Sequence, residues 1–439
     1  MSKFVRSVSV LALSVAMVAA PAHAAPTTKD KREQKTTDIK GDGIQVMGDS
    51  DITATPSDQS QGPGLEISGG TSFNAYIFKQ KQREQNGGKG RGTHFGADDS
   101  RINFQVLGKA GPELDGLEYS FLIGLTGNTE AGKTSVEENR IKLKNRYGTL
   151  IGGVHRGVTD FMAVGPFAFY AGTGNVLGNY KSIVNETTGV VIRDDLKGAP
   201  KDQTKITYVT PRFFGIQAGY SYAPDGNQSG EAKLASKALA PKDGGMSPVG
   251  QNVHELGLNF KKEFANSFGI QLSATSLFGN SKDTKAHYGA GYSDIAAYAL
   301  GLVINYGGFS IGGEYLDNGR SLEWNGLTGN DSGRVFNVGV GYSYDRHAVS
   351  LGYLHSKRNL GRNKATDFNY GTTKANVGSL SYDYKLAKGL KLYAEGVAFQ
   401  YKTSSTAQAT AWKEATMASK DAVGNNNGHA IMLGSAISF

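Results

Sequence analysis

The sequence predicts an all-β protein, a 16-stranded antiparallel transmembrane β-barrel. Apolar and polar residues alternate with a period of two along segments of about ten residues, the length that crosses a membrane as a tilted strand. The links between these segments alternate between short and long, as in an outer-membrane barrel. The composition agrees, because 60 Gly, 21 Tyr and 20 Phe against 11 Pro suit many strands joined by turns.

The N-terminus has the pattern of an export signal. Lys3 and Arg6 form a positive start, Val8 to Ala20 is mostly apolar, and Ala22-His23-Ala24 places small residues at the spacing that signal peptidase reads. We therefore expect residues 1–24 to be a signal peptide that is cleaved after Ala24. An uncleaved anchor helix would need about 20 apolar residues, more than this run supplies. No later window resembles a transmembrane helix.

Residues 25–64 are polar, with a charged cluster at Lys29 to Glu33 and Gly62-Pro63-Gly64 at the end. Such a composition cannot bury enough apolar surface to fold alone, so we predict a mobile periplasmic linker. A small plug or a contact with the cell wall is the alternative. The barrel itself is predicted to occupy residues 65–439.

Charge and cysteine usage set only loose limits. There is no cysteine, which excludes a disulfide framework or a thiolate site. The formal net charge is +8, and removing Lys3 and Arg6 with the signal peptide leaves 8 − 2 = +6. This excess is compatible with nucleic acid, anionic lipid or a basic channel wall. A membrane barrel favours the last two, and we expect no nucleic-acid partner.

Sixteen segments follow the period of two. They lie at about 66–79, 99–109, 115–126, 136–146, 148–156, 204–210, 213–223, 251–262, 266–278, 293–306, 308–317, 333–344, 347–356, 373–385, 389–402 and 429–439. Long links lie at 80–98, 157–203, 224–250, 279–292, 318–332, 357–372 and 403–428. Short turns at one rim and long loops at the other are typical of outer-membrane barrels.

A soluble antiparallel sandwich would also alternate, with its apolar face turned inward. Strand length and the tyrosines near strand ends, such as Tyr220, Tyr222, Tyr382 and Tyr384, favour the membrane barrel, in which they would form an aromatic girdle. The last segment, 429–439, alternates as well. We expect it to pair with the first strand, because an open edge of that length would pair with other chains.

Three local patterns carry a resemblance to a known family. They are Tyr147-Gly148-Thr149-Leu150 with Gly152-Gly153, the stretch from Lys205 to Gly215 followed by Gly219-Tyr220-Ser221-Tyr222, and the terminal Phe439. In this order they resemble the general bacterial porins, the sixteen-stranded trimeric family of the Gram-negative outer membrane, over residues 66–439. One position departs from the family, because Val154 rather than an arginine follows Gly153.

The resemblance implies an outer-membrane channel for passive diffusion of small hydrophilic solutes and ions. It also implies a homotrimer, a terminal signal read by the barrel-assembly machinery, and a third loop, 157–203, that folds into the lumen as a constriction. The apolar start of this loop, residues 160–170, favours packing against the inner wall. An external loop covering the mouth is the alternative. A barrel of sixteen strands leaves a water column that needs such a constriction.

We expect a basic wall opposite the loop. Arg140, Lys142, Lys144 and Arg146 share one face of a strand, and facing lipid would cost each of them roughly 2–4 kcal/mol. We expect Arg101 on a neighbouring strand to join them. The loop offers Asp160, Glu186, Asp194 and Asp195 as opposing acids, so a transverse field and a preference for anions are predicted. Lys144 and Arg146 could instead snorkel at the periplasmic rim.

Catalysis finds little support. Residues 127–134 match a phosphate-loop pattern but lead into a strand rather than a helix, and Gly308 to Gly312 matches a nucleophile elbow inside a predicted strand. The histidines are not spaced as metal ligands, so we expect no cofactor, no metal and no enzyme. A substrate-specific channel with a solute-binding constriction is the strongest alternative function. A barrel lipase, a surface scaffold and calcium between the loop acids stay open.

Overall fold

The computed structural model describes residues 63–81, 84–85, 88–89, 92–114, 116–128, 133–176, 184, 190–191, 195–226, 228–230, 249–282, 291–405, 407–408, 410–411 and 424–439. The predicted signal peptide and residues 25–62 of the predicted linker lie outside these ranges. So do residues 129–132 of the phosphate-loop match and the loop acids Glu186 and Asp194.

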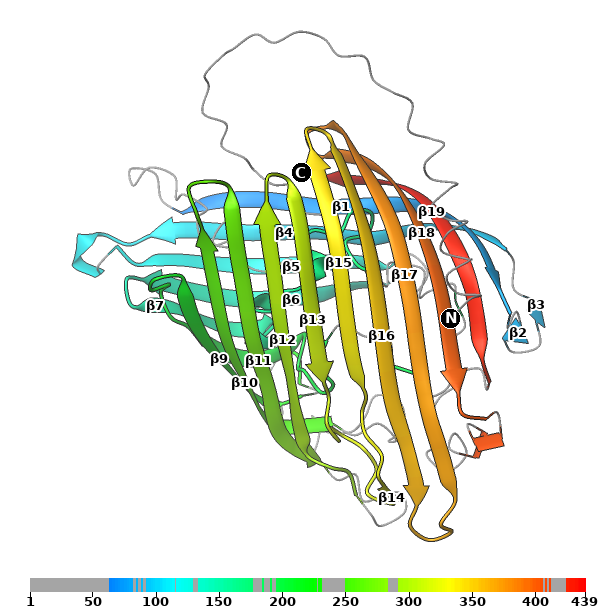
Figure 1. Ribbon diagram of the computed structural model, residues 1–439. Helices are drawn as coiled ribbons and strands as arrows, with labels where there is room; N and C mark the ends of the chain where they lie inside the picture. Colours follow the sequence, from blue (N-terminus) through cyan, green and yellow to red (C-terminus); the bar gives the residue numbers. More distant parts are fainter. Residues whose placement is uncertain are drawn as a thin grey trace, which may run out of the picture.

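One antiparallel sheet curls into a closed barrel (Figure 1). The sheet has 17 strands, of which β14 (Leu327–Thr328) has only two residues, so 17 − 1 = 16 strands form the barrel. In barrel order these are β1 (Gly64–Gln80), β4 (Thr93–Lys109), β5 (Glu118–Asn128), β6 (Lys133–Asn145), β7 (Gly148–His155), β8 (Gln203–Val209), β9 (Ile216–Asp225), β10 (Val249–Glu263), β11 (Phe268–Lys282), β12 (Ile295–Tyr306), β13 (Phe309–Asp317), β15 (Arg334–Tyr344), β16 (His347–Asn363), β17 (Asn369–Ala387), β18 (Leu390–Thr403) and β19 (Asn426–Ser438).

Short elements complete the described chain. They are β2 (Glu84–Gln85), which pairs with β3 (Gly88–Lys89), and the short helices η1 (Pro112–Leu114), α3 (Val158–Phe161) and η2 (Pro166–Ala168). Among the described residues no helix is long and apolar enough to cross a membrane, a finding that does not bear on crossing by strands.

The first and last strands close the barrel. β1 and β19 pair antiparallel from Gly70 opposite Ser438 to Gln80 opposite Gly428. Beyond them, Gly69 and Phe439 exchange two backbone hydrogen bonds of 3.0 Å. The predicted closure and strand number are confirmed. Closure pairs both edges of the barrel sheet within the chain, which is the condition for a sheet to cross lipid.

The two faces of each strand differ in exposure. On β15, Phe336 and Val340 are each 46% exposed, whereas the alternating neighbours Val335 and Asn337 are 1% and 2% exposed. The buried face points into the barrel, because one buried cluster joins residues of β10 and β19, which lie on different sides of it. The exposed apolar face is therefore the one that meets lipid.

The strands run further than the period of two predicts at the long-loop end. β16 continues seven residues past the predicted end, to Asn363 rather than 356, and forms with β17 the long hairpin at the bottom of Figure 1. The extra residues of β16 are mostly polar, but Leu360 among them is buried and packs with Leu327 of β14 and Tyr370 of β17. β14 pairs with this extension.

Candidate functional site

The long link between β7 and β8, which we call the 157–203 segment, follows the buried face of the barrel. Its backbone N–H groups donate to side chains on six different strands. The acceptors, with N···O distances of 2.7–3.1 Å, are Ser221 on β9, Glu255 on β10, Ser273 on β11, Ser350 on β16, Asp383 on β17 and Glu395 on β18. Each bond contributes roughly 0.5–3 kcal/mol, most where the acceptor is ionised, so together they hold the segment to one path.

The segment approaches the wall too closely for side chains at several wall positions. A Cβ on Gly257 of β10 would lie 2.8 Å from Sδ of Met162, and one on Gly301 of β12 would overlap the carbonyl oxygen of Val164. At Gly301 the close atom belongs to the backbone, so glycine is required there, whereas at Gly257 a larger residue would force the Met162 side chain to shift. The segment crowds four further glycines in the same way, namely Gly219, Gly312, Gly339 and Gly352.

The apolar start of the segment is buried. Phe161, Met162, Val164, Phe167 and Tyr170 are all less than 10% exposed. Val158, Phe161 and Met162 pack with Val209 of β8 around α3, while η2 contacts β13 and β15. Residues 158–170 therefore contact several strands of the barrel, and their burial removes from water the side chains that a free loop would expose.

Lys205 on β8 joins the two ends of the segment. Its ammonium group donates to the carbonyl oxygens of His155 and Pro200 and, at 2.7 Å, to that of Lys201. The three N–H donors of the group thus meet three carbonyls, and Lys205 is only 3% exposed. One side chain thereby fixes where the segment leaves β7 and where it returns to β8.

Four of the predicted wall cations share the buried face. Arg140, Lys142 and Lys144 alternate on β6 with the exposed Ile141 and Leu143. Arg101 reaches this group from β4 through its ion pair with Glu138, which also lies 3.7 Å from Arg140. Arg146 is not with them, because β6 ends at Asn145. It lies in the following turn, where its guanidinium stacks 4.7 Å from the Tyr147 ring centroid.

The wall also carries acids that the sequence prediction missed. Arg101 lies 3.1 Å from Glu138 and 3.6 Å from Glu137, and Lys144 lies 3.1 Å from Glu118. Glu138 stands two residues before Arg140, so the period of two already places it on the same face. Glu137 lies near Glu138 because β6 has a β-bulge at this point. Val136 and Glu138 pair with adjacent residues of β5, so Glu137 is the extra residue between them.

The described loop acids lie beside cations at or next to the ends of the segment. Asp160 in α3 pairs with Arg156 at 3.1 Å, and Asp195 pairs with Lys201 at 3.4 Å. Asp160 and Asp195 line one pocket between the segment and the wall, together with Gly157, Thr159, Ala163, Phe167, Leu196, Ala199, Pro200, Lys201, Glu255, Ala299, Glu314 and Leu316. Among the described residues, no group of three His, Asp or Glu side chains could hold a metal ion.

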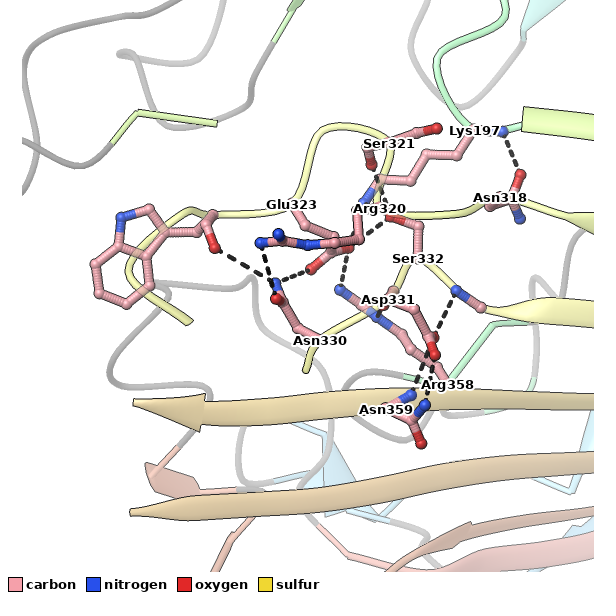
Figure 2. A network of polar contacts seen from close by, with 12 residues as sticks. Lys197, Asn318, Arg320, Ser321, Glu323, Asn330, Asp331, Ser332, Arg358 and Asn359 are labelled. Carbon is pink, nitrogen blue, oxygen red and sulfur yellow. Dashed lines mark hydrogen bonds and ion pairs between the residues drawn. The ribbon is translucent and has the colours of Figure 1, made fainter. Parts of the chain in front are cut away.

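A polar network ties the end of the segment to the loop between β13 and β15 (Figure 2). Glu323 accepts from Lys197 and from Arg358, each at 2.7 Å, and from Ser332 at 2.8 Å. Burial by itself raises the pKa of Glu323, but the charges of Arg358 and Lys197 outweigh it and lower the pKa to about 2. Glu323 is therefore a carboxylate that the two cations hold in place.

Comparison with known proteins gives the same fold. The solved outer membrane channel DcaP of Acinetobacter baumannii is 12% identical, with a TM-score of 0.54 over 88% of this chain and 100% of that one. OmpT of Vibrio cholerae in its trimer form is 13% identical, with a TM-score of 0.53 over 86% and 100%. An anion-selective porin from Comamonas acidovorans is 16% identical, with a TM-score of 0.50 over 86% and 100%. At such identities the likeness shows the fold alone.

Curated relatives match only in part. Uncharacterized proteins of Rickettsia prowazekii and Rickettsia conorii are 26% and 28% identical over 244 residues, which is 48% of this chain. The match spans about half of those relatives, 53% of their length.

The family model for Gram-negative porins matches residues 9–404, most of the chain. The family and the closed barrel are those of channels in the outer membrane rather than of enzymes. The chain therefore belongs to the Gram-negative porin family and is an outer-membrane β-barrel.

Proposed function

We propose that the barrel is a water-filled channel for passive diffusion of small hydrophilic solutes and ions, and that the 157–203 segment is its constriction. A sixteen-stranded barrel is too wide for wall side chains to fill. The observation that carries the proposal is the row of hydrogen bonds from the segment to six strands, since a segment bound along the inner face reduces the open cross-section.

The free side of the channel is then the wall of β4 to β6, opposite the segment. Among the side chains that the structure describes there, the ion pairs and the shared face bring together four cations, Arg101, Arg140, Lys142 and Lys144, and three acids, Glu118, Glu137 and Glu138, which balance to 4 − 3 = +1 among these seven residues. We infer a weak preference for anions. As the opposing acids of a transverse field we propose Asp160 and Asp195, whose charges are partly offset by Arg156 and Lys201, together with Glu186 and Asp194, which lie outside the described residues.

Single-channel recording in planar bilayers tests the proposal. The folded protein should give stepwise conductance, with flux limited by solute size across many solutes. The reversal potential in a salt gradient should have the sign of anion preference. An electrically silent membrane would remove the channel function, and conductance that saturates with one solute would replace general diffusion by a solute-specific channel.

We also propose a homotrimer. One neighbour of the same fold is a trimer, and β1 and β4 present the stacked pair Phe73 and Phe95, 54% and 71% exposed, on the lipid-facing side. Aromatic side chains of this size contribute strongly to subunit contacts. Light scattering of the protein in detergent should give the mass of three chains, and F73R/F95R should reduce it to one chain.

For the ends of the sequence we propose export through residues 1–24, a linker at 25–64, and insertion by the barrel-assembly machinery. Mass spectrometry of protein purified from outer membranes should find Ala25 as the first residue. A mass that includes residues 1–24 would contradict cleavage.

A further inference from the structure

Four cations stand in one row across four neighbouring strands on the outside of the barrel. Arg334 on β15 is directly opposite Lys357 on β16, Lys357 is opposite Lys374 on β17, and Lys374 is opposite Lys402 on β18. All four side chains are exposed. They continue the outward face of their strands, since Arg334 stands two residues before the lipid-facing Phe336.

This arrangement is unfavourable without a counter-anion. Like charges directly opposite on neighbouring strands destabilise a sheet. Arg334 forms an ion pair with Asp317 on β13, with an N···O distance of 2.9 Å. Within the part of the chain that the structure describes, Lys357, Lys374 and Lys402 form no ion pair. The row therefore offers at least three unmatched positive charges.

The row lies at the level of lipid headgroups. Near the short turns, Tyr344, His347 and Tyr384 form a second row in the same register, and His347 stacks 5.2 Å from the Tyr384 ring centroid. In β15, β16 and β17 the two rows are separated by ten residues, from 334 to 344, 347 to 357 and 374 to 384.

Ten residues span roughly 33 Å along a strand. At the tilt of barrel strands this is about 25 Å along the membrane normal, the height of the apolar band of an outer-membrane barrel. The aromatic row thus marks the periplasmic interface, because short turns face the periplasm. The cation row marks the outer-leaflet interface one apolar band away.

We propose that Arg334, Lys357, Lys374 and Lys402 bind the headgroup of an outer-leaflet lipid that carries two or more phosphates. Four strands at about 4.8 Å spacing make the row roughly 14 Å long, more than a single phosphate covers. Lysine is a point-charge donor to phosphate oxygens, and the partially desolvated interface strengthens the pairing. The depth of the row selects a membrane lipid, since a soluble anion has no reason to bind there.

The test uses protein refolded into detergent without added lipid and titrated with lipid in native mass spectrometry. The probes are bisphosphoryl lipid A, monophosphoryl lipid A and inorganic phosphate. The wild type should bind the bisphosphoryl lipid more tightly than the monophosphoryl one. K357Q/K374Q/K402Q should weaken bisphosphoryl binding by on the order of 100-fold, from the loss of three lysines at a phosphate surface. Added salt should weaken wild-type binding.

The matched control is K364Q/K385Q/K388Q, which removes three exposed lysines outside the row and should bind like the wild type. Equal affinity of the wild type and the row variant would overturn the proposal, and so would an equal loss in the control. Displacement of the lipid by inorganic phosphate at equal phosphate concentration would assign the row to a soluble anion instead. Without lipid, the row variant should unfold at no lower temperature than the wild type, because it lacks the like-charge repulsion. A lower unfolding temperature of the row variant would mean that the lysines stabilise the folded protein, and this would count against a role in lipid binding.

Discussion

Arg101 on β4 and Glu138 on β6 form a 3.1 Å ion pair that passes over the intervening strand β5. Gly124 of β5 leaves the space for it, since a Cβ there would lie 3.1 Å from Nη2 of Arg101. Glu138 is 8% exposed and also lies 3.7 Å from Arg140. One carboxylate therefore moderates two of the four wall cations that we place beside the channel.

Replacing Glu138 by Gln should strengthen the preference for anions. The change leaves Arg101 and Arg140 less compensated, and the ratio of anion to cation permeability should rise by roughly two- to fivefold at low salt. The reversal potential in a tenfold KCl gradient measures this ratio. E263Q, which removes an acid with a 76% exposed side chain near a short turn, should not change it. A ratio that E138Q leaves unaltered would mean that ions do not pass this wall.

Neutralising the wall cations should act in the opposite direction. R140Q/K142Q removes two positive charges from the buried face of β6 and should lower the permeability ratio or invert it, because the acids then dominate. R146Q is the matched control, since that arginine lies in the turn after β6 and stacks on Tyr147. Selectivity that survives the double substitution would place the constriction elsewhere.

Lys205 should position the 157–203 segment through its ammonium group. The chain has no cysteine, so K205C provides one thiol that can be alkylated in the unfolded protein before refolding. A propyl group on the thiol restores length without charge, and an aminoethyl group restores both. We expect the propyl form to lose the wild-type conductance level in favour of larger, noisier openings, because three carbonyls lose their donor.

The aminoethyl form should recover the wild-type conductance level and noise. This rescue separates positioning of the segment from a general packing role, because both adducts fill a similar volume. Two adducts with the same conductance and noise would show that the hydrogen bonds of Lys205 do not hold the segment.

The network around Glu323 should persist to strongly acidic pH. The pKa of this carboxyl is lowered from 4.5 to about 2, so its contribution is fully present above pH 4.5 and is lost as the pH falls through about 2. The difference corresponds to about 3 kcal/mol of local stability. Trp324, the next residue in the chain, can report this change by its fluorescence in a W412F background.

The midpoint of that fluorescence titration should lie near pH 2 in the otherwise unchanged protein. It should move up toward 4.5 in R358Q, because one of the two cations that hold the carboxylate is gone. K388Q, a change at an exposed turn lysine, should leave it in place. A midpoint near 4.5 in the parent protein would contradict the strength of the network.

The sequence alone determined the barrel. The alternation of apolar and polar residues with a period of two indicates which side of a strand faces lipid. The lengths of the turns indicate which end of the barrel faces the periplasm. The sixteen strands and their closure through β1 and β19 could therefore be predicted. The shared face of Arg140, Lys142 and Lys144 follows from the same local rule. The apolar residues 160–170 also indicated that their segment packs on a wall.

Only the tertiary structure decided what these groups meet. Glu137 turns inward because of a bulge, Arg101 reaches Glu138 across β5, and Lys205 meets carbonyls on both sides of a long segment. The row from Arg334 to Lys402 exists only through the register of four strands. Such contacts join residues far apart in the chain, and register and bulges are set by the packing of the whole sheet, so no local period encodes them.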